Sequence, residues 1–228
     1  MTDVVILGAG GLAREVLGVF DDANLDAKKW NVLGFVDDSP ALHGVTLCDL
    51  PVLGGFEWLE RRGDKNFQVI CGTGSPTSRR AFAERAGAWS LQFCQIVHPS
   101  ARVSRWVELG TGTVVTAGCI LTTQITLGAH AFVNLNSTIG HDCVIGAYCN
   151  INPGCCISGN VKMGEGVDLG TGAAVIQGKQ IGEWSVIGAG AAVTQDIPAH
   201  VTAVGVPCRV IKRHPAYAAL SVPSGRAN

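Results

Sequence analysis

The sequence predicts an α/β region followed by an all-β region, in which short strands wind into a parallel β-helix. A hydrophobic residue recurs at every sixth position from residue 97 onward. Near the N-terminus, a glycine-rich turn lies between a short apolar run and an amphipathic segment. Only 15% of the 228 residues are charged and 30 are glycine, which suits a structure with many tight turns better than a helical bundle.

The first region begins with a strand, a glycine turn and a helix, in that order. The apolar run "VVIL" leads into the pattern G-x-G-x-x-[GA], which is formed by Gly8, Gly10 and Ala13. The next strand, "NVLGFVDD", ends in Asp37 and Asp38. Glycines at such a turn let backbone N–H groups approach a phosphate, and an acid after the second strand can hold a ribose or a polar ring.

This Rossmann-like βαβ region, residues 1–95, has about half the length of a full dinucleotide-binding fold. A third strand, "FQVICGTGS", ends in another glycine turn, but no second mononucleotide-binding half follows it. The sequence therefore favours binding of a single nucleotide or a nucleotide-linked group over binding of NAD. A purely structural role for the glycines, as a tight strand-to-helix turn, stays open at this point.

The second region repeats every six residues. Cutting the chain from Val97 gives 17 blocks, and each block begins with Val, Leu, Ile or Met. The fifth place is mostly small or β-branched, with Lys179 as the large polar exception. Such a period is typical of a parallel β-helix, in which each block forms a short strand and a corner and three blocks form a coil. We expect the first and fifth places of these blocks to point inward. The β-helix domain is expected over residues 96–213, followed by a tail of residues 214–228.

The nine cysteines form no C-x-x-C pair and no other zinc or disulfide pattern. Four of them occupy the fifth place of a block, namely Cys119, Cys143, Cys149 and Cys155. Because successive blocks lie on different faces, we expect these thiols to be small core residues and not a metal ladder.

Charge and hydropathy exclude several classes of partner. The 17 basic and 18 acidic residues nearly cancel, which indicates no nucleic-acid partner. The N-terminus lacks a signal-peptide pattern, and no run approaches the roughly 20 apolar residues of a membrane span. We therefore expect a reduced, cytoplasmic protein with no membrane partner.

His141 and Asp142 lie in the stretch "NLNSTIGHDCVIG" and occupy the third and fourth places of one block. Both side chains are therefore expected at the outer surface, near a corner. One interpretation is a solvated polar corner. The other is a catalytic base, because an adjacent carboxylate favours the charged form of an imidazole and Asn134 lies on the preceding block. The residues alone leave both interpretations open.

Four stretches together resemble one known family: "GAGGLAREV", "FVDD", "NLNSTIGHDCVIG" and "VGVPCRVIK". They are similar to the bacterial sugar acetyltransferases of the left-handed β-helix (hexapeptide repeat) superfamily. This branch contains the N-acetyltransferases of nucleotide-linked amino sugars (the PglD type) and the sialic acid O-acetyltransferases. The resemblance implies a left-handed helix, a homotrimer, acetyl-CoA as co-substrate between neighbouring chains, and a nucleotide sugar on the N-terminal domain.

The resemblance also implies roles for individual residues. His141 matches the general base, Asp142 an acid that increases the basicity of that histidine, and Asn134 a polar contact to the reacting sugar. The pocket for the nucleotide and sugar is matched by Gly10, Gly11, Leu12, Asp37, Asp38 and Gly72. The positions that hold the acetyl-CoA arm are matched by Asn150, Gly159, Thr171 and Ala189. Leu12 and Asn150 stand where some members have histidine, so at least one substrate contact is expected to differ. The oxyanion is expected to be held by the Asn150 amide or by backbone N–H groups.

The function that follows is acetyl-CoA-dependent N-acetylation of a nucleotide-linked amino sugar, by direct transfer with a histidine base. Acetylation of a sugar or sialic acid hydroxyl is the alternative, because one base serves both acceptors. A metal-dependent β-helix enzyme is disfavoured, since a zinc site needs about three histidines and the repeats offer only His98, His130 and His141. A non-catalytic nucleotide-sugar-binding trimer is the remaining alternative. No metal is expected.

Overall fold

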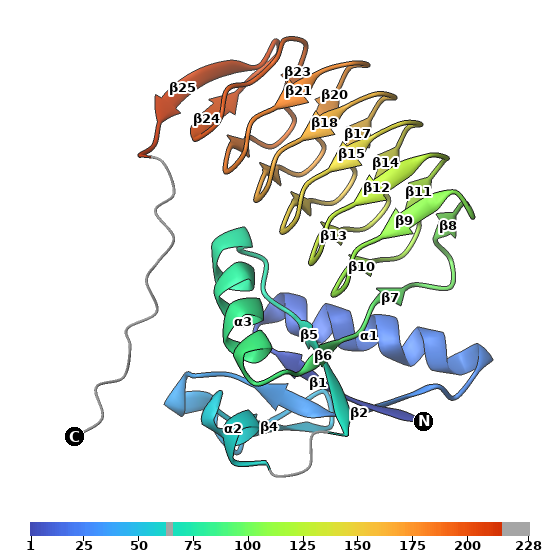
Figure 1. Ribbon diagram of the computed structural model, residues 1–228, viewed down its shortest axis with the longest axis vertical. Helices are drawn as coiled ribbons and strands as arrows, with labels where there is room; N and C mark the ends of the chain where they lie inside the picture. The colour runs from blue at the N-terminus through green and yellow to red at the C-terminus, as the bar shows by residue number, and fades with distance from the viewer. Residues whose placement is uncertain (63–65, 216–228) are drawn as a thin grey trace.

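The computed structural model describes residues 1–62 and 66–215. An α/β region and a β-helix lie one above the other along the longest axis (Figure 1). The predicted fold class is confirmed, and the change of architecture falls between β6 and β7. Most of the predicted tail, residues 216–228, lies outside the described residues. Within the described part of the chain, every helix is too short or too polar to cross a membrane.

The N-terminal region is a six-stranded sheet in the order β3-β4-β2-β1-β5-β6. Its elements are β1 (Thr2–Leu7), α1 (Gly11–Asp26), β2 (Trp30–Val36), the 3-10 helix η1 (Pro40–Leu42), β3 (Thr46–Leu47), β4 (Leu50–Gly54), α2 (Glu57–Arg61), β5 (Phe67–Cys71), α3 (Pro76–Ala88) and β6 (Gln92–Phe93). β2 and β5 flank β1 and run parallel to it. The chain therefore leaves β1 in one direction and returns on its other side, which creates a switch point at the carboxyl edge.

The β-helix has three faces, each a sheet of parallel strands from successive coils, and one antiparallel strand is added at the end of the first face. Face 1 contains β7 (Ile96–Val97), β10 (Val114–Val115), β13 (Phe132–Val133), β16 (Asn150–Ile151), β19 (Asp168–Leu169), β22 (Val186–Ile187), β24 (Val201–Val204) and the antiparallel β25 (Arg209–Arg213). Face 2 contains β8 (Arg102–Val103), β11 (Ile120–Leu121), β14 (Thr138–Ile139), β17 (Cys156–Ile157), β20 (Ala174–Val175) and β23 (Ala192–Val193).

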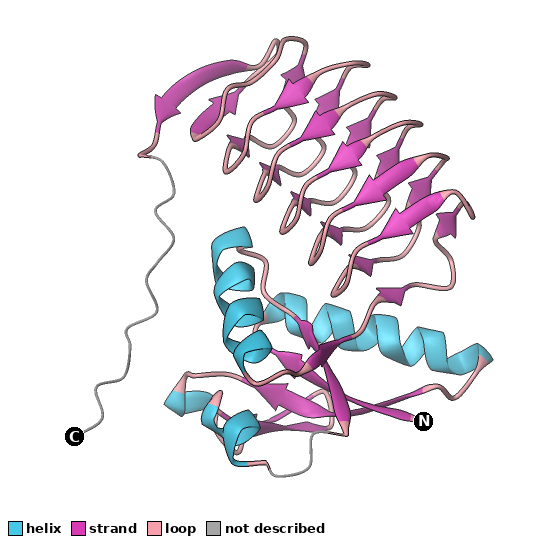
Figure 2. Ribbon diagram, viewed as in Figure 1, coloured by secondary structure: helices cyan, strands magenta, loops and turns pink. Residues whose placement is uncertain are grey.

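Face 3 contains β9 (Val107–Leu109), β12 (Ile125–Leu127), β15 (Val144–Ile145), β18 (Lys162–Met163) and β21 (Gln180–Ile181). Figure 2 shows the short strands of successive coils stacked in rows. In the third coil, the corner after face 1 covers residues 134–137, the corner after face 2 covers 140–143, and the corner after face 3 covers 146–149. We name the three columns of corners the first, second and third vertex.

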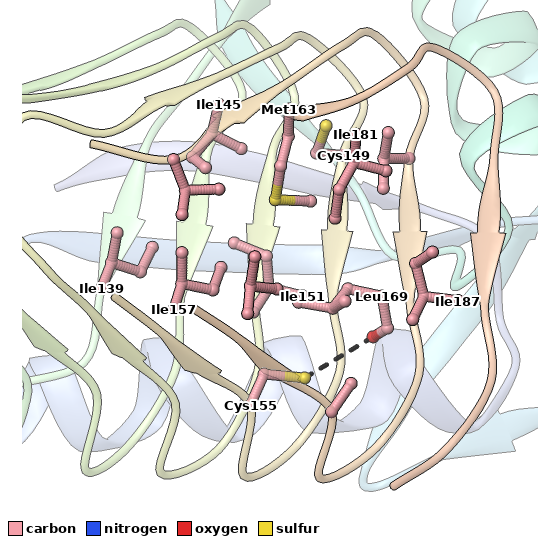
Figure 3. Close-up of a cluster of buried hydrophobic side chains, with 14 of the residues drawn as sticks. Ile139, Ile145, Cys149, Ile151, Cys155, Ile157, Met163, Leu169, Ile181 and Ile187 are labelled. Atoms are coloured by element: carbon pink, nitrogen blue, oxygen red, sulfur yellow. Dashed lines mark hydrogen bonds between the residues drawn. The ribbon is translucent and has the colours of Figure 1, made fainter. Parts of the chain in front are cut away.

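The interior of the β-helix confirms the predicted hexapeptide frame. First-place residues such as Ile139, Ile157 and Leu169 are buried and lie along the axis (Figure 3). The four fifth-place cysteines are fully buried, and the Cys155 thiol donates to the Leu169 carbonyl at 3.6 Å. Burial raises the pKa of the Cys149 thiol to about 12. These thiols are therefore protonated core groups at neutral pH.

Each corner turns sharply at the fourth place of its block, where the backbone enters the left-handed region. The φ angles are 57° at His130, 60° at Asp142 and 59° at Tyr148. Glycine fills this place in several coils, and Asn or Asp, which tolerate this conformation, fill others.

The N-terminal region packs on face 1 and on its two bordering vertices. α1 shares one hydrophobic cluster with Val114 and Phe132 of face 1. At the first vertex, His98 Nε2 lies 2.7 Å from Asp22 Oδ2 of α1. At the third vertex, Arg79 of α3 donates to the Tyr148 carbonyl at 3.1 Å. The second vertex is opposite face 1, and among the described residues it has no hydrogen bond or ion pair to the N-terminal region.

Candidate active site

His141 lies on the second vertex, and its side chain is 50% exposed. Its Nδ1 atom is 2.7 Å from Asp142 Oδ2. An ionised carboxylate can only accept a hydrogen bond, so the proton at this contact belongs to Nδ1. The neutral ring then carries its free lone pair on Nε2, the atom that a general base needs. His141 therefore contacts Asp142 as predicted, and this contact selects the tautomer of His141 that carries its proton on Nδ1.

Asp142 has a second function at this corner. It occupies the left-handed fourth place, and its N–H donates to the Thr123 carbonyl of the preceding coil at 3.1 Å. Because aspartate tolerates the left-handed backbone of a corner, its presence at a fourth place does not by itself indicate a catalytic role. The short contact between this carboxylate and the His141 imidazole favours the catalytic interpretation.

The glycine turn after β1 is held in place by Asp37. Asp37 Oδ2 accepts from the Ala9 N–H and Oδ1 from the Ser39 N–H, both at 2.9 Å. Gly10 is the exposed residue that precedes α1, and no side chain caps this helix end. The turn therefore presents free N–H groups at the carboxyl edge, as a phosphate-binding turn requires, while Asp37 itself supports the turn.

Asp38 is directed toward protein groups at the same edge. Its Oδ1 accepts from the Phe56 N–H at 3.0 Å, and its Oδ2 forms an ion pair with Arg85. Burial favours a higher pKa for Asp38, but the hydrogen bonds from Arg85 and Phe56 outweigh it and hold the pKa below its usual value. The carboxylate is therefore ionised and already paired.

Gly72 has a packing reason to be glycine. It follows β5, and a Cβ atom there would lie 2.7 Å from the Cα atom of Ala13 in α1. α1 can approach the end of β5 this closely only because Gly72 has no side chain. Leu12 lies half-buried beside this junction, with its Cδ2 atom 3.8 Å from the position of a Cβ on Gly74.

The two asparagines of the predicted site lie away from His141 within one chain. Asn134 begins the first vertex and is 8% exposed, and its Oδ1 accepts from the Leu135 N–H at 2.8 Å. Asn150 lies on face 1, and its Nδ2 atom donates to Asn152 and to Asp168, both at 3.1 Å. The amide hydrogens of Asn150 are thus engaged in a polar cluster on the face opposite His141.

The remaining predicted cofactor residues all occupy the third place of a block. Gly159 lies on the second vertex, one coil beyond His141, and is buried. Thr171 and Ala189 are exposed and lie on the first vertex in successive coils. Face 2 separates these two positions from Gly159 within one chain.

The sequence interpretation did not identify Arg79, which joins the two regions. This side chain is 1% exposed. It donates to the Thr73 carbonyl at 2.9 Å, to Tyr148 at 3.1 Å and to Cys149 at 3.3 Å. Burial lowers its pKa to about 10. Arg79 therefore connects the loop after β5 to the third vertex, and no local sequence signal could reveal partners 69 and 70 residues away.

The three histidines of the metal alternative lie at three separate places. His98 pairs with Asp22 at the first vertex, and His130 is buried at the third vertex between Phe93 and Tyr148. His141 is on the second vertex. Since the vertices of one prism point apart, these rings cannot converge on one ion. Within residues 1–62 and 66–215, the structure contains no metal-binding group of three or more His, Cys, Asp or Glu residues.

A groove of 570 Å³ runs along face 3, beginning three residues after His141. It is lined by Val144, Lys162, Met163, Gly164, Gln180, Ile181, Gly182, Asp196, Ile197 and Pro198. The groove has a mostly apolar lining with three polar side chains, Lys162, Gln180 and Asp196, and it lies next to the vertex that carries the histidine.

Comparisons with known proteins place the chain in a family. The model of the PglD N-terminal domain matches residues 3–86. A histidine-to-asparagine variant of perosamine N-acetyltransferase from Caulobacter crescentus, solved with CoA and GDP-perosamine, is 31% identical, with a TM-score of 0.86 over 92% of this chain and 97% of that chain. The acetyltransferase domain of PglB from Neisseria gonorrhoeae is 30% identical, with a TM-score of 0.85 over 92% and 100% of the two chains.

WeeI from Acinetobacter baumannii is 27% identical, with a TM-score of 0.83 over 92% of this chain and 100% of that chain. No curated protein sequence gave a significant match. The fold and these matches define an acyltransferase of the left-handed β-helix class. The chain belongs to the PglD-type family of bacterial sugar N-acetyltransferases.

Proposed function

We propose that this protein transfers the acetyl group of acetyl-CoA to the amino group of a nucleotide-linked amino sugar, with His141 as the general base. The observation that carries the proposal is the 2.7 Å contact between His141 Nδ1 and Asp142, which leaves Nε2 free to accept a proton. Support also comes from a relative of 31% identity that was solved with CoA and GDP-perosamine and with one histidine replaced by Asn or Ala.

The reaction needs one proton transfer and no acyl-enzyme. The sugar nitrogen attacks the thioester carbonyl while His141 Nε2 accepts a proton from it, a contribution of about 10²–10⁴ in rate. The tetrahedral intermediate then expels the thiolate of CoA, which takes up a proton as the amide forms. Cys143 is unsuited as a nucleophile, because burial raises the pKa of its thiol.

We assign the stabilisation of the oxyanion to backbone N–H groups near the second vertex. The amide hydrogens of Asn150 already donate to Asn152 and Asp168, so a new acceptor would have to displace one of these partners. Backbone donors are fixed by the coil geometry and need no rearrangement in the transition state.

The active site requires two chains. The glycine turn and Asp37 lie on the region that packs against face 1, whereas His141 is on the opposite vertex. A nucleotide sugar held at the carboxyl edge therefore reaches the histidine of a neighbouring chain. We propose a homotrimer with acetyl-CoA between neighbours, in which Thr171 and Ala189 of one chain face Gly159 of the next. Exposed Ile120 and Ile176 on and beside face 2 supply apolar contact surface for this assembly.

We also place the reaction in the cytoplasm, where acetyl-CoA is available and thiols remain reduced. All nine cysteines are free thiols. Seven of these thiols are buried.

The activity is tested by incubating the protein with acetyl-CoA and a panel of nucleotide-linked amino sugars, and by following release of the CoA thiol. Each amino sugar is matched with the analogue that carries a hydroxyl in place of the amine. We expect turnover with an amine and none with its hydroxyl partner. Preferred turnover of the hydroxyl analogues would replace N-acetylation by O-acetylation, and no turnover with either set would contradict the proposal.

The two-chain site has its own test. His141→Ala lacks the base, and Asp37→Ala loses the support of the glycine turn. Co-expression of the two variants should give mixed trimers in which some interfaces pair an intact base with an intact nucleotide region, so activity should exceed that of either variant alone. If the site lay within one chain, mixing would recover nothing.

A further inference from the structure

Gly159 lies directly beneath the imidazole ring of His141. A Cβ atom on Gly159 would lie 2.5 Å from both Cε1 and Nε2 of His141, and 2.9 Å from Cδ2. Three ring atoms lie within 2.9 Å of the position of this Cβ, so the ring occupies the space that a side chain at position 159 would need. Real side chains do not approach this closely, and any larger residue at position 159 must displace the ring.

The surrounding backbone fixes this arrangement. The Asn160 N–H donates to the His141 carbonyl at 2.7 Å, which holds the two coils together at this vertex. A Cβ on Gly140 would lie 2.6 Å from the Gly159 nitrogen, so the coils are in close contact just before the histidine. The backbone at Gly159 therefore cannot move away to make room for a side chain.

Gly159 is unusual in its column. The third places of the second vertex in successive coils are Arg105, Thr123, His141, Gly159, Gln177 and Gln195. Only the residue that follows the histidine by one coil lacks a side chain. No left-handed φ explains this glycine, since its neighbour Asn160 is the residue with a φ of 58°. The absence of a Cβ at position 159 therefore matters because of the ring above it.

We propose that Gly159 is a positioning residue for the catalytic base, an inference that rests on the proposed role of His141. The flat surface over Gly159 sets the plane of the ring, so that Nδ1 reaches Asp142 and Nε2 keeps one direction. A methyl group at this position rotates the ring about its side-chain torsions, away from Asp142. The hydrogen bond that selects the tautomer is then lost, and the base is misplaced.

This role differs from the contact to acetyl-CoA that the family resemblance implies for the same residue. A residue that only holds the cofactor would affect the KM for acetyl-CoA. A residue that orients the base would affect kcat, and its substitution would have this effect only when the imidazole is present. Gly159 is buried beneath the ring, which favours the second role.

The decisive experiment is a double-mutant cycle with Gly159→Ala and His141→Ala. We expect Gly159→Ala to lower kcat by about 10-fold or more with little change in the KM for acetyl-CoA, and to have no further effect in the His141→Ala background. Equal losses of kcat in both backgrounds, or a rise in KM alone, would overturn the proposal.

Stability provides a readout that does not depend on activity. Gly159→Ala should lower the melting temperature, and adding His141→Ala should restore it, because the group that the methyl meets is gone. This double variant also keeps the proposal testable should Gly159→Ala alone fail to fold. Unchanged instability in the double variant would show that the methyl meets the backbone and not the ring.

The tautomer can be observed directly by nitrogen NMR of His141. The wild-type ring should carry its proton on Nδ1, and Gly159→Ala should shift the population toward Nε2. This result does not require substrate, so it separates failure of the positioning role from failure of the proposed reaction. Gly188→Ala is the matched control, since its Cβ would meet Val204, with the side-chain Cγ1 atom at 2.7 Å, and not the His141 ring. It should leave the His141 tautomer unchanged.

Discussion

The second and third vertices of the β-helix each carry a histidine, and their environments differ completely. His141 on the second vertex is half exposed and hydrogen-bonded to Asp142. His130 on the third vertex is 5% exposed and stacks on Tyr148, with ring centroids 5.3 Å apart. Burial lowers the pKa of His130 to about 4. The β-helix offers similar corners, and the docked N-terminal region buries the histidine at one of them while the other keeps an exposed imidazole.

Replacing the exposed histidine should produce the largest effect on activity. His141→Ala should lower kcat by about 10²-fold or more, because the proton acceptor is removed. The unfolding transition should hardly change, since no core contact is lost. Steady-state kinetics together with circular dichroism checks both statements.

Cys143→Ala is the control for this variant, two positions further along the chain. Its thiol is fully buried and its Sγ atom donates to the Ser158 carbonyl at 3.1 Å. We expect a loss of about 1–2 kcal/mol in the free energy of unfolding with normal kcat. If Cys143→Ala abolished turnover while remaining folded, the assignment of the base would be wrong.

Removing Arg79 should produce the largest effect on stability, at the third vertex. Arg79→Ala leaves the carbonyls of Thr73, Tyr148 and Cys149 without their buried donor and should cost about 2–4 kcal/mol. Denaturant unfolding measures this cost. Because the two regions are then less firmly docked, the KM for the nucleotide sugar should rise, while binding of acetyl-CoA should be largely retained.

Arg80→Ala is a matched control on the next residue of α3. Arg80 forms partly exposed ion pairs with Glu84 and Glu165, and such pairs contribute no more than about 1 kcal/mol. A larger cost for Arg80→Ala than for Arg79→Ala would show that the joint depends on the exposed ion pairs.

The buried histidine should make stability depend on pH. The unfolded chain binds a proton near pH 6.5, but the folded state resists it until about pH 4. Between these values the unfolded state binds more protons than the folded state. The contribution of neutral His130 to the free energy of unfolding is therefore fully present above pH 6.5 and is lost as the pH falls toward 4. His130→Phe should flatten the dependence of the unfolding free energy on pH in this window. If the unfolding free energy of His130→Phe kept the same slope against pH in this window, the pH dependence would come from other groups.

The smallest of these effects should come from Asp142→Asn. The amide keeps the left-handed corner, because Asn tolerates this backbone as well as Asp does. It no longer holds the Nδ1 proton as a carboxylate does, so kcat should fall by a smaller factor than in His141→Ala, about 10-fold. A loss equal to that of His141→Ala would mean that the two residues act as a single unit.

The sequence predicted the site unevenly. The pairing of His141 with Asp142 follows from adjacency and from the hexapeptide frame, and the structure has both side chains outward and in contact. Asp38 was predicted to contact the substrate, but its carboxylate is paired with Arg85, 47 residues away. No local pattern reveals such a partner. Gly159, which lies beneath His141, follows it by one coil of three six-residue blocks. The period alone could therefore have identified Gly159 as a neighbour of His141.

The periodic sequence by itself determined which side chains enter the β-helix and which face outward, because the coil geometry repeats locally and each block defines its own inward places. The fully buried thiols of Cys119, Cys143 and Cys149 follow from that frame. Only the tertiary structure decided which two vertices contact the N-terminal region and which one stayed open. That choice depends on contacts such as Arg79 with Cys149, between segments 70 residues apart, and such contacts form only when two folded surfaces meet.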